Sequence, residues 1–151
     1  YGLMTLVFDV FKGFFAVYAA RRFLTGALPV YINAFSVIMG HIFPVTMKFH
    51  GGKGVATAFG AIMAVNWCLG VLALGVVSVG LAASQRMSVG SILGAASFPI
   101  ICWIFEPGFI YIGSVMALII IVKHRANIVR LLKGEEPKMF GNKKKEESHE
   151  E

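Results

Sequence analysis

The sequence contains little charge and almost no cysteine. Asp, Glu, Lys and Arg make up 15% of its 151 residues, and its two cysteines, Cys68 and Cys102, stand singly in apolar segments. Two isolated cysteines offer neither a disulfide framework nor the paired spacing of a thiolate metal site. We therefore expect no metal and no cofactor, and we expect both cysteines to be ordinary core residues.

Long apolar segments stand where charge is missing. No Asp, Glu, Lys or Arg occurs from Phe23 to Met47 or from Gly54 to Gln85, and apolar residues form 57% of the chain. This share far exceeds that of an ordinary globular domain, so the composition predicts an all-α, polytopic membrane protein. The net charge of +6 suits a membrane surface or a phosphorylated substrate, and nucleic-acid binding is not needed to explain it.

The apolar segments predict six transmembrane helices, since about 20 helical residues cross a bilayer. We expect them at about 3–20, 29–45, 55–65, 69–84, 89–105 and 109–122. The third is short, and Asn66, Trp67 and Gly70 mark its break from the fourth. Residues 1–137 would form one membrane-embedded domain, and residues 138–151, rich in Lys and Glu, a disordered charged cytoplasmic tail.

Two charges stand inside the first apolar segment. Asp9 and Lys12 are three residues apart, so they share one helix face. An unpaired charge at that depth costs a few kcal/mol, and we expect each to have a partner. They form either a structural ion pair that fixes helix packing or a site in which Lys12 lies near an anion.

A glycine-rich loop is the central polar feature of the chain. It contains Gly51, Gly52, Lys53 and Gly54. Glycines let backbone N–H groups approach an anion closely, and lysine adds a compact positive charge. A helix that begins at Gly54 directs its unsatisfied N–H groups back into the loop. The loop therefore predicts a phosphate site.

This loop is not an ATPase P-loop. The Walker A motif needs a glycine where this chain has Met47, and a Ser or Thr where it has Gly54. The alternative to a phosphate site is a glycine-rich turn between two membrane helices, in which Lys48 and Lys53 only mark the cytoplasmic side.

Polar side chains recur after the last apolar segment. His124, Asn127 and Arg130 follow at three-residue intervals, which places them on one helix face. The alternative is an amphipathic helix that lies on anionic lipid. The positive-inside rule puts the glycine loop, a polar hinge around Arg86 and this segment on the cytoplasmic face, although Arg86 alone is equally typical of a topology marker.

Several motifs resemble those of one enzyme family. The stretches GHIFP at 40–44, FHGGKGVAT at 49–57 and NIVRLLKGE at 127–135 resemble the second and third signature motifs of the bacterial acyl-phosphate:glycerol-3-phosphate acyltransferases, the PlsY family. DVFKG at 9–13 and SQRMSVGS at 84–91 look like further family segments. Members carry an additional N-terminal helix and a first motif rich in Ser, Gly and Asn, so the resemblance implies seven spans at full length, of which this chain holds the last six.

The resemblance also implies a reaction. Family members transfer a fatty acyl group from acyl phosphate to the primary hydroxyl of glycerol 3-phosphate, giving lysophosphatidic acid and phosphate for phospholipid biosynthesis. We expect a multi-pass protein of the bacterial inner (plasma) membrane with a cytoplasmic active face. Its partners would be the two substrates and membrane lipid, with no nucleic acid and no obligate protein partner.

The candidate site residues follow from two phosphorylated substrates. Predicted catalytic residues are His41, Lys53, His124 and Asn127; predicted substrate-binding residues are Gly51, Gly52, Gly54, Thr57, Arg130 and Glu135. Cations and backbone N–H groups would hold phosphate and stabilise the charge that grows on the acyl carbonyl. Either histidine, or the phosphate of the substrate itself, would accept the hydroxyl proton, and Asn127 would orient the glycerol.

The rival interpretation is a non-enzymatic helical bundle, such as a transporter or a lipid-binding subunit, in which Asp9 and Lys12 belong to an ion pathway. The enzyme interpretation requires that Lys53 and Asn127 lie close together on one side of the membrane.

Overall fold

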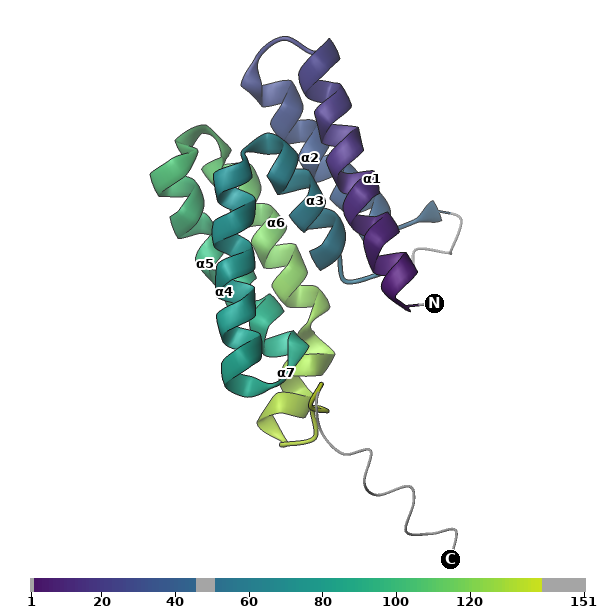
Figure 1. The fold of residues 1–151 in the computed structure, drawn as a ribbon, viewed down its shortest axis with the longest axis vertical. Coiled ribbons are helices and arrows are strands. Elements are labelled where there is room, and N and C mark those ends of the chain that lie inside the picture. Colours follow the sequence, from purple (N-terminus) through teal and green to yellow (C-terminus); the bar gives the residue numbers. More distant parts are fainter. Residues whose placement is uncertain (1, 46–50, 140–151) are drawn as a thin grey trace, which may run out of the picture.

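The computed structural model describes residues 2–45 and 51–139, and every regular element within them is a helix (Figure 1). The elements are α1 (Gly2–Phe23), α2 (Ala27–Ile42), α3 (Val55–Val65), α4 (Trp67–Ser84), α5 (Met87–Phe105), the 3-10 turn η2 (Pro107–Phe109), α6 (Ile110–Lys123) and α7 (Arg125–Leu132). The predicted all-α class is confirmed. Most of the predicted tail, 140–151, lies outside the described residues.

Not all of the apolar helices have the length of a membrane span. α1, α4 and α5 are long and apolar enough to cross a membrane, and Pro107–Lys123 with Arg125–Leu132 forms a fourth candidate that is bent by 55°. α2 is shorter, and the 11 residues of α3 extend only about 16 Å at ~1.5 Å per residue, half of a ~30 Å hydrocarbon layer. The count of six spans therefore stays a prediction.

Glycines let neighbouring helices approach closely. A Cβ on Gly13 of α1 would collide with the carbonyl oxygen of Thr57 in α3, and one on Gly90 of α5 would collide with the carbonyl oxygen of Val77 in α4. Gly94, one turn beyond Gly90, also faces Val77. Small residues of this kind allow close packing of transmembrane helices.

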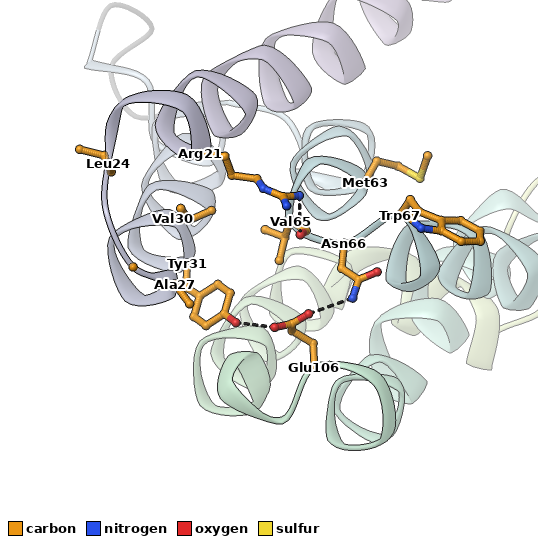
Figure 2. Close-up of a pocket in the computed structure, with 11 residues that line it drawn as sticks. Arg21, Leu24, Ala27, Val30, Tyr31, Met63, Val65, Asn66, Trp67 and Glu106 are labelled. Atoms are coloured by element: carbon orange, nitrogen blue, oxygen red, sulfur yellow. Dashed lines mark hydrogen bonds between the residues drawn. The ribbon is translucent and has the colours of Figure 1, made fainter.

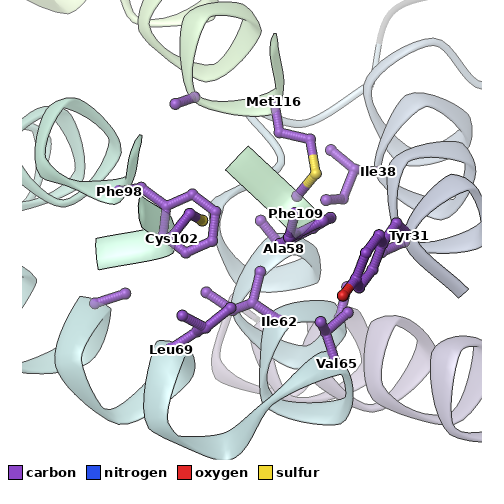
Figure 3. Close-up of a cluster of buried hydrophobic side chains, with 14 of the residues drawn as sticks. Tyr31, Ile38, Ala58, Ile62, Val65, Leu69, Phe98, Cys102, Phe109 and Met116 are labelled. Atoms are coloured by element: carbon purple, nitrogen blue, oxygen red, sulfur yellow. The ribbon is translucent and has the colours of Figure 1, made fainter. Parts of the chain in front are cut away.

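The core lies between the six helices α1 to α6, and Figure 3 shows its central part. Phe109 is fully buried, and its ring lies 4.9 Å from that of Tyr31 and 6.2 Å from that of Phe98, centroid to centroid. Because lipid tails are as apolar as these side chains, their packing gains come mainly from van der Waals contact. Cys102 is buried here as expected, whereas Cys68 is half-buried.

The carboxylate of Glu106 joins three helix ends, those at the start of α2, between α3 and α4, and after α5. The Tyr31 hydroxyl donates to Glu106 Oε1 at 2.5 Å, and Asn66 Nδ2 donates to Glu106 Oε2 at 2.9 Å (Figure 2). The other amide atom of Asn66, Oδ1, accepts from the backbone N–H of Cys68 and caps α4. Asn66 thus separates α3 from α4, as the sequence predicted.

Arg21 completes this end of the bundle. Its Nη1 donates to the carbonyl oxygens of Ala64 at 2.8 Å and Val65 at 3.0 Å (Figure 2). These carbonyls belong to the last turn of α3, where a cation also offsets the negative end of the helix dipole. Arg21 and Glu106 line one cavity of about 580 Å³, and we call this region the far end.

Candidate active site

A larger cavity opens at the opposite end of the bundle. Its volume is about 1030 Å³. The polar lining comes from α1, the end of α2, the glycine loop, the start of α5, the α6–α7 region and the segment after α7. It comprises Thr5, Asp9, Lys12, His41, Gly51, Gly52, Lys53, Gly54, Ser88, Ser91, His124, Asn127, Glu136 and Lys138. Lys53 and Asn127 thus line one cavity. The three polar segments that were expected on one face meet here.

The remainder of the cavity is apolar. It runs between α4, α5 and α6, and its lining includes Ala73, Leu74, Val77, Gly94, Ala95, Phe98, Met116, Ala117 and Ile120. The small residues Gly94 and Ala95 leave room between the helices. A charged mouth that continues into an apolar channel suits a molecule with a polar head and a hydrocarbon chain.

The glycine loop passes directly over the end of α2. A Cβ on Gly51 would collide with the carbonyl oxygen of His41, and one on Gly52 would collide with the His41 ring. Gly54 has φ +85 and precedes the first residue of α3, in a left-handed conformation that favours glycine. The structure therefore requires these glycines for close approach, whatever they bind. Lys48 and the rest of 46–50 lie outside the described residues.

The predicted Asp9–Lys12 ion pair is present and extends to a third residue. Lys12 Nζ donates to Asp9 Oδ1 and lies 2.6 Å from His41 Nδ1. His41 Nδ1 lies 3.4 Å from Asp9 Oδ1. All three side chains line the cavity. The ion pair is therefore present, and a position of Lys12 near an anion stays a prediction.

His124 occupies the bend between α6 and α7. Its side chain is 2% exposed, and its Nδ1 lies 2.8 Å from the carbonyl oxygen of Ile120. A carbonyl oxygen only accepts, so Nδ1 carries a hydrogen and donates it. In the neutral imidazole the lone pair then lies on Nε2, and His124 lines the cavity.

Asn127 and Arg130 share a buried carboxylate that the sequence reasoning missed. Asn127 Nδ2 donates to Glu136 Oε1 at 2.7 Å, and Arg130 Nε donates to Glu136 Oε2 at 2.7 Å. Burial by itself would raise the pKa of Glu136, but hydrogen bonds from Ser88, Asn127 and Arg130, together with the charge of Arg130, outweigh it and lower the pKa to about 2. Asn127 Oδ1 is buried and has no hydrogen-bond partner among the described residues.

The segment around Glu136 is fixed to the hinge between α4 and α5. Arg86 Nε donates to the backbone oxygen of Glu136 at 3.0 Å, and the Met139 N–H donates to the backbone oxygen of Gln85 at 2.7 Å. Arg86 therefore has a structural contact beyond any effect on topology. Ser88, at the start of α5, also lines the cavity, and its hydroxyl contributes to the lowered pKa of Glu136.

Three of the predicted substrate-binding residues do not line the cavity. Thr57 is fully buried where α3 crosses Gly13 of α1. Arg130 reaches the site only through Glu136, and Glu135 is exposed. Their predicted roles stay predictions. Within 2–45 and 51–139, no group of three His, Cys, Asp or Glu residues could hold a metal ion.

Fold and site together define a membrane protein whose cavity fits an amphiphile with an anionic head. A family model described as glycerol-3-phosphate acyltransferase matches residues 1–134. The chain belongs to this family, and the resemblance to PlsY proteins is confirmed.

Individual relatives agree with this assignment. The chain is similar to the glycerol-3-phosphate acyltransferase of Pectobacterium carotovorum subsp. carotovorum (strain PC1), with 39% identity over 147 residues that cover 96% of this chain and 69% of the relative. It is 41% identical over 142 residues to that of Dinoroseobacter shibae (strain DSM 16493 / NCIMB 14021 / DFL 12), covering 93% and 69%.

Two solved structures share the fold. They are crystal structures of PlsY (YgiH), an integral membrane glycerol 3-phosphate acyltransferase, and each is 30% identical to this chain. The glycerol 3-phosphate form has a TM-score of 0.85 and covers 93% of this chain and 72% of that one. The lysophosphatidic acid form has a TM-score of 0.83, with coverage of 91% and 72%.

Proposed function

We propose that this protein transfers a fatty acyl group from acyl phosphate to the sn-1 hydroxyl of glycerol 3-phosphate at the cytoplasmic face of the bacterial inner membrane. The glycerol oxygen forms an ester bond to the acyl carbon, the bond from that carbon to the phosphate oxygen breaks, and lysophosphatidic acid and phosphate leave. The observation that carries this proposal is the cavity that joins a cationic mouth to an apolar channel.

Phosphate would be held at the glycine loop. Lys53 supplies the charge, and the backbone N–H groups of Gly51, Gly52 and Gly54 lie beside it in the cavity lining. The N-terminus of α3, which begins at Val55, adds the positive end of its dipole. The same donors would stabilise negative charge on the acyl carbonyl as the hydroxyl attacks.

The acyl chain would extend into the apolar channel between α4, α5 and α6. Leu74 and Val77 line the cavity from α4, and Phe98 lines it from α5. Met116 and Ile120 line it from α6. This placement keeps the hydrocarbon out of water while the carbonyl stays at the mouth, near Lys53. Acyl phosphate fits such a cavity because its reactive bond lies between chain and phosphate.

Glycerol 3-phosphate would bind beside Asn127. The unpartnered Asn127 Oδ1 can accept a hydrogen bond from a glycerol hydroxyl, because Glu136 fixes the amide by holding its nitrogen. The hydroxyl proton would pass to Nε2 of His124 or to a substrate phosphate. Neither route needs a covalent acyl-enzyme. Family membership leaves the rival non-enzymatic bundle without supporting observations.

The experiment that tests this proposal is a comparison of donors. Membranes containing the protein are incubated with labelled glycerol 3-phosphate and palmitoyl phosphate, palmitoyl-CoA or palmitoyl-acyl carrier protein, and lysophosphatidic acid is measured. We expect product with palmitoyl phosphate alone, together with one equivalent of inorganic phosphate. Product from a thioester without acyl phosphate would contradict the donor, and no product from any of the three would contradict the proposed reaction.

A further inference from the structure

We propose that Lys12 is a positioning residue that holds the proton of His41 on Nε2, so that His41 donates a hydrogen bond to the phosphate at the glycine loop instead of acting as a base. The phosphate in this inference rests on the proposed function. The position of the proton rests on the contacts of His41 alone.

The contact between Lys12 and His41 has a defined direction. Lys12 Nζ also contacts the carboxylate of Asp9, which favours the ammonium form, and an ammonium group has three donors and no acceptor. At 2.6 Å from Lys12 Nζ, His41 Nδ1 must therefore accept. A neutral imidazole has one N–H, so its hydrogen lies on Nε2.

The remaining ring nitrogen of His41 faces the glycine loop. Of the His41 ring atoms, Nε2 lies nearest to the position that a Cβ on Gly52 would occupy. The charged groups that line the cavity around this ring are Asp9 and Lys12 from α1 and Lys53 from the loop. The Nε2 hydrogen thus joins the backbone N–H groups and Lys53 as a further donor for an anion held there.

His124 has the opposite arrangement. Its Nδ1 donates to the carbonyl oxygen of Ile120, which leaves the lone pair on Nε2. The two histidines of the cavity are therefore not interchangeable bases: Lys12 makes His41 a donor, and the backbone of α6 makes His124 an acceptor. The same spectrum can observe both, because each fixed imidazole has one protonated and one unprotonated nitrogen.

The first test is ¹⁵N NMR of the purified full-length protein with labelled histidine, in which His41→Gln assigns the His41 signals. We expect His41 to carry hydrogen on Nε2 from pH 6 to 8, and His124 to carry it on Nδ1. In Lys12→Met the His41 tautomers should mix, because Nδ1 loses its donor, whereas Lys12→Arg, which still donates, should preserve the assignment. An unchanged His124 signal shows that a variant is folded.

The second test is the pH dependence of kcat/KM with acyl phosphate. Lys12→Met should lower kcat/KM about tenfold at pH 8, the effect of one lost charge-assisted hydrogen bond. The deficit should narrow as the pH falls, because a protonated imidazole carries a hydrogen on both nitrogens and so regains the N–H on Nε2. A purely structural role for Lys12 predicts a deficit that does not depend on pH. Lys12→Arg should retain most of the activity.

These outcomes separate the inference from the proposed function. Hydrogen on His41 Nδ1 in the unsubstituted protein, or a Lys12→Met protein with unaltered signals and an unaltered pH profile, overturns the inference even when acyl transfer is normal. If the unsubstituted protein makes no lysophosphatidic acid, the proposed function fails, and the NMR spectra alone decide whether Lys12 sets the tautomer.

Discussion

The two ends of the bundle differ in how completely their polar groups are hydrogen-bonded and paired. At the far end, both carboxylate oxygens of Glu106 accept hydrogen bonds, and Arg21 donates to the end of α3. At the end that holds the larger cavity, Lys53 has no ion pair within the described residues, and Asn127 Oδ1 is buried there without a hydrogen-bond partner. Buried polar groups are normally satisfied. The far end is therefore a structural tie, whereas the other end keeps polar atoms that are available to the substrate proposed above.

The largest expected difference between the two ends appears when one cation is removed from each. Lys53→Ala should lower kcat more than 10²-fold, because the charge that stabilises the transition state is lost. Arg22→Ala removes an exposed cation at the far end and should leave activity unchanged. Initial rates of lysophosphatidic acid formation measure both. Near-normal activity of Lys53→Ala would contradict the proposal that the glycine loop holds phosphate.

The second prediction concerns Glu136, which lines the larger cavity and accepts a hydrogen bond at each of its two carboxylate oxygens. Glu136→Ala leaves Asn127 and Arg130 without their shared acceptor and should lower the free energy of unfolding by about 3 kcal/mol. Denaturant unfolding in detergent is the measurement, and the neighbouring exposed Glu135→Ala is the stability control. Equal stabilities of the two variants would show that the buried network contributes little.

At the far end, loss of a partner should affect stability and not catalysis. Tyr31→Phe deletes the hydroxyl that donates to Glu106 and should lower the free energy of unfolding by about 1.5 kcal/mol, with kcat unchanged. Tyr111→Phe, at a tyrosine that is 83% exposed, is the matched control. A large fall in kcat for Tyr31→Phe would mean that the two ends are coupled.

The smallest expected effect is a pH dependence. The pKa of Glu136 falls from 4.5 to about 2 on folding, so the unfolded chain takes up this proton first. The stabilisation from Glu136 is therefore fully present above pH ~4.5 and is lost as the pH falls toward ~2. The free energy of unfolding of the unsubstituted protein and of Glu136→Gln should be measured at pH 5, 4 and 3. The difference between the two should become smaller as the pH falls. A constant difference would contradict the shifted pKa.

The sequence defined helix positions well where strong signals flank a helix. The predicted bounds of α3 agree with the structure, because a glycine loop precedes it and Asn66 caps the next helix. The number of spans was harder to predict. An apolar segment can face lipid or other helices, and α3, whose residues are mostly buried, is apolar because it lies inside the bundle.

The site was predictable at the level of segments but not of every side chain. The sequence reasoning chose Glu135, whereas the structure buries Glu136. Gly134, at φ +73, ends α7 and turns the chain back, and such a turn decides which of two adjacent carboxylates points inward. Likewise Thr57 follows the glycine loop closely in sequence, but the crossing of α3 with Gly13 buries it away from the cavity.

The contact of Arg21 with the last turn of α3 has an electrostatic consequence for the opposite end. α3 has 11 residues, most of them buried, and its two poles face the two polar ends of the bundle. Arg21 neutralises the negative pole, whereas the positive pole, beside Lys53, has no counter-ion in the described residues. A phosphate held at the glycine loop, as proposed above, would face this positive pole and balance the dipole of α3 at its second end.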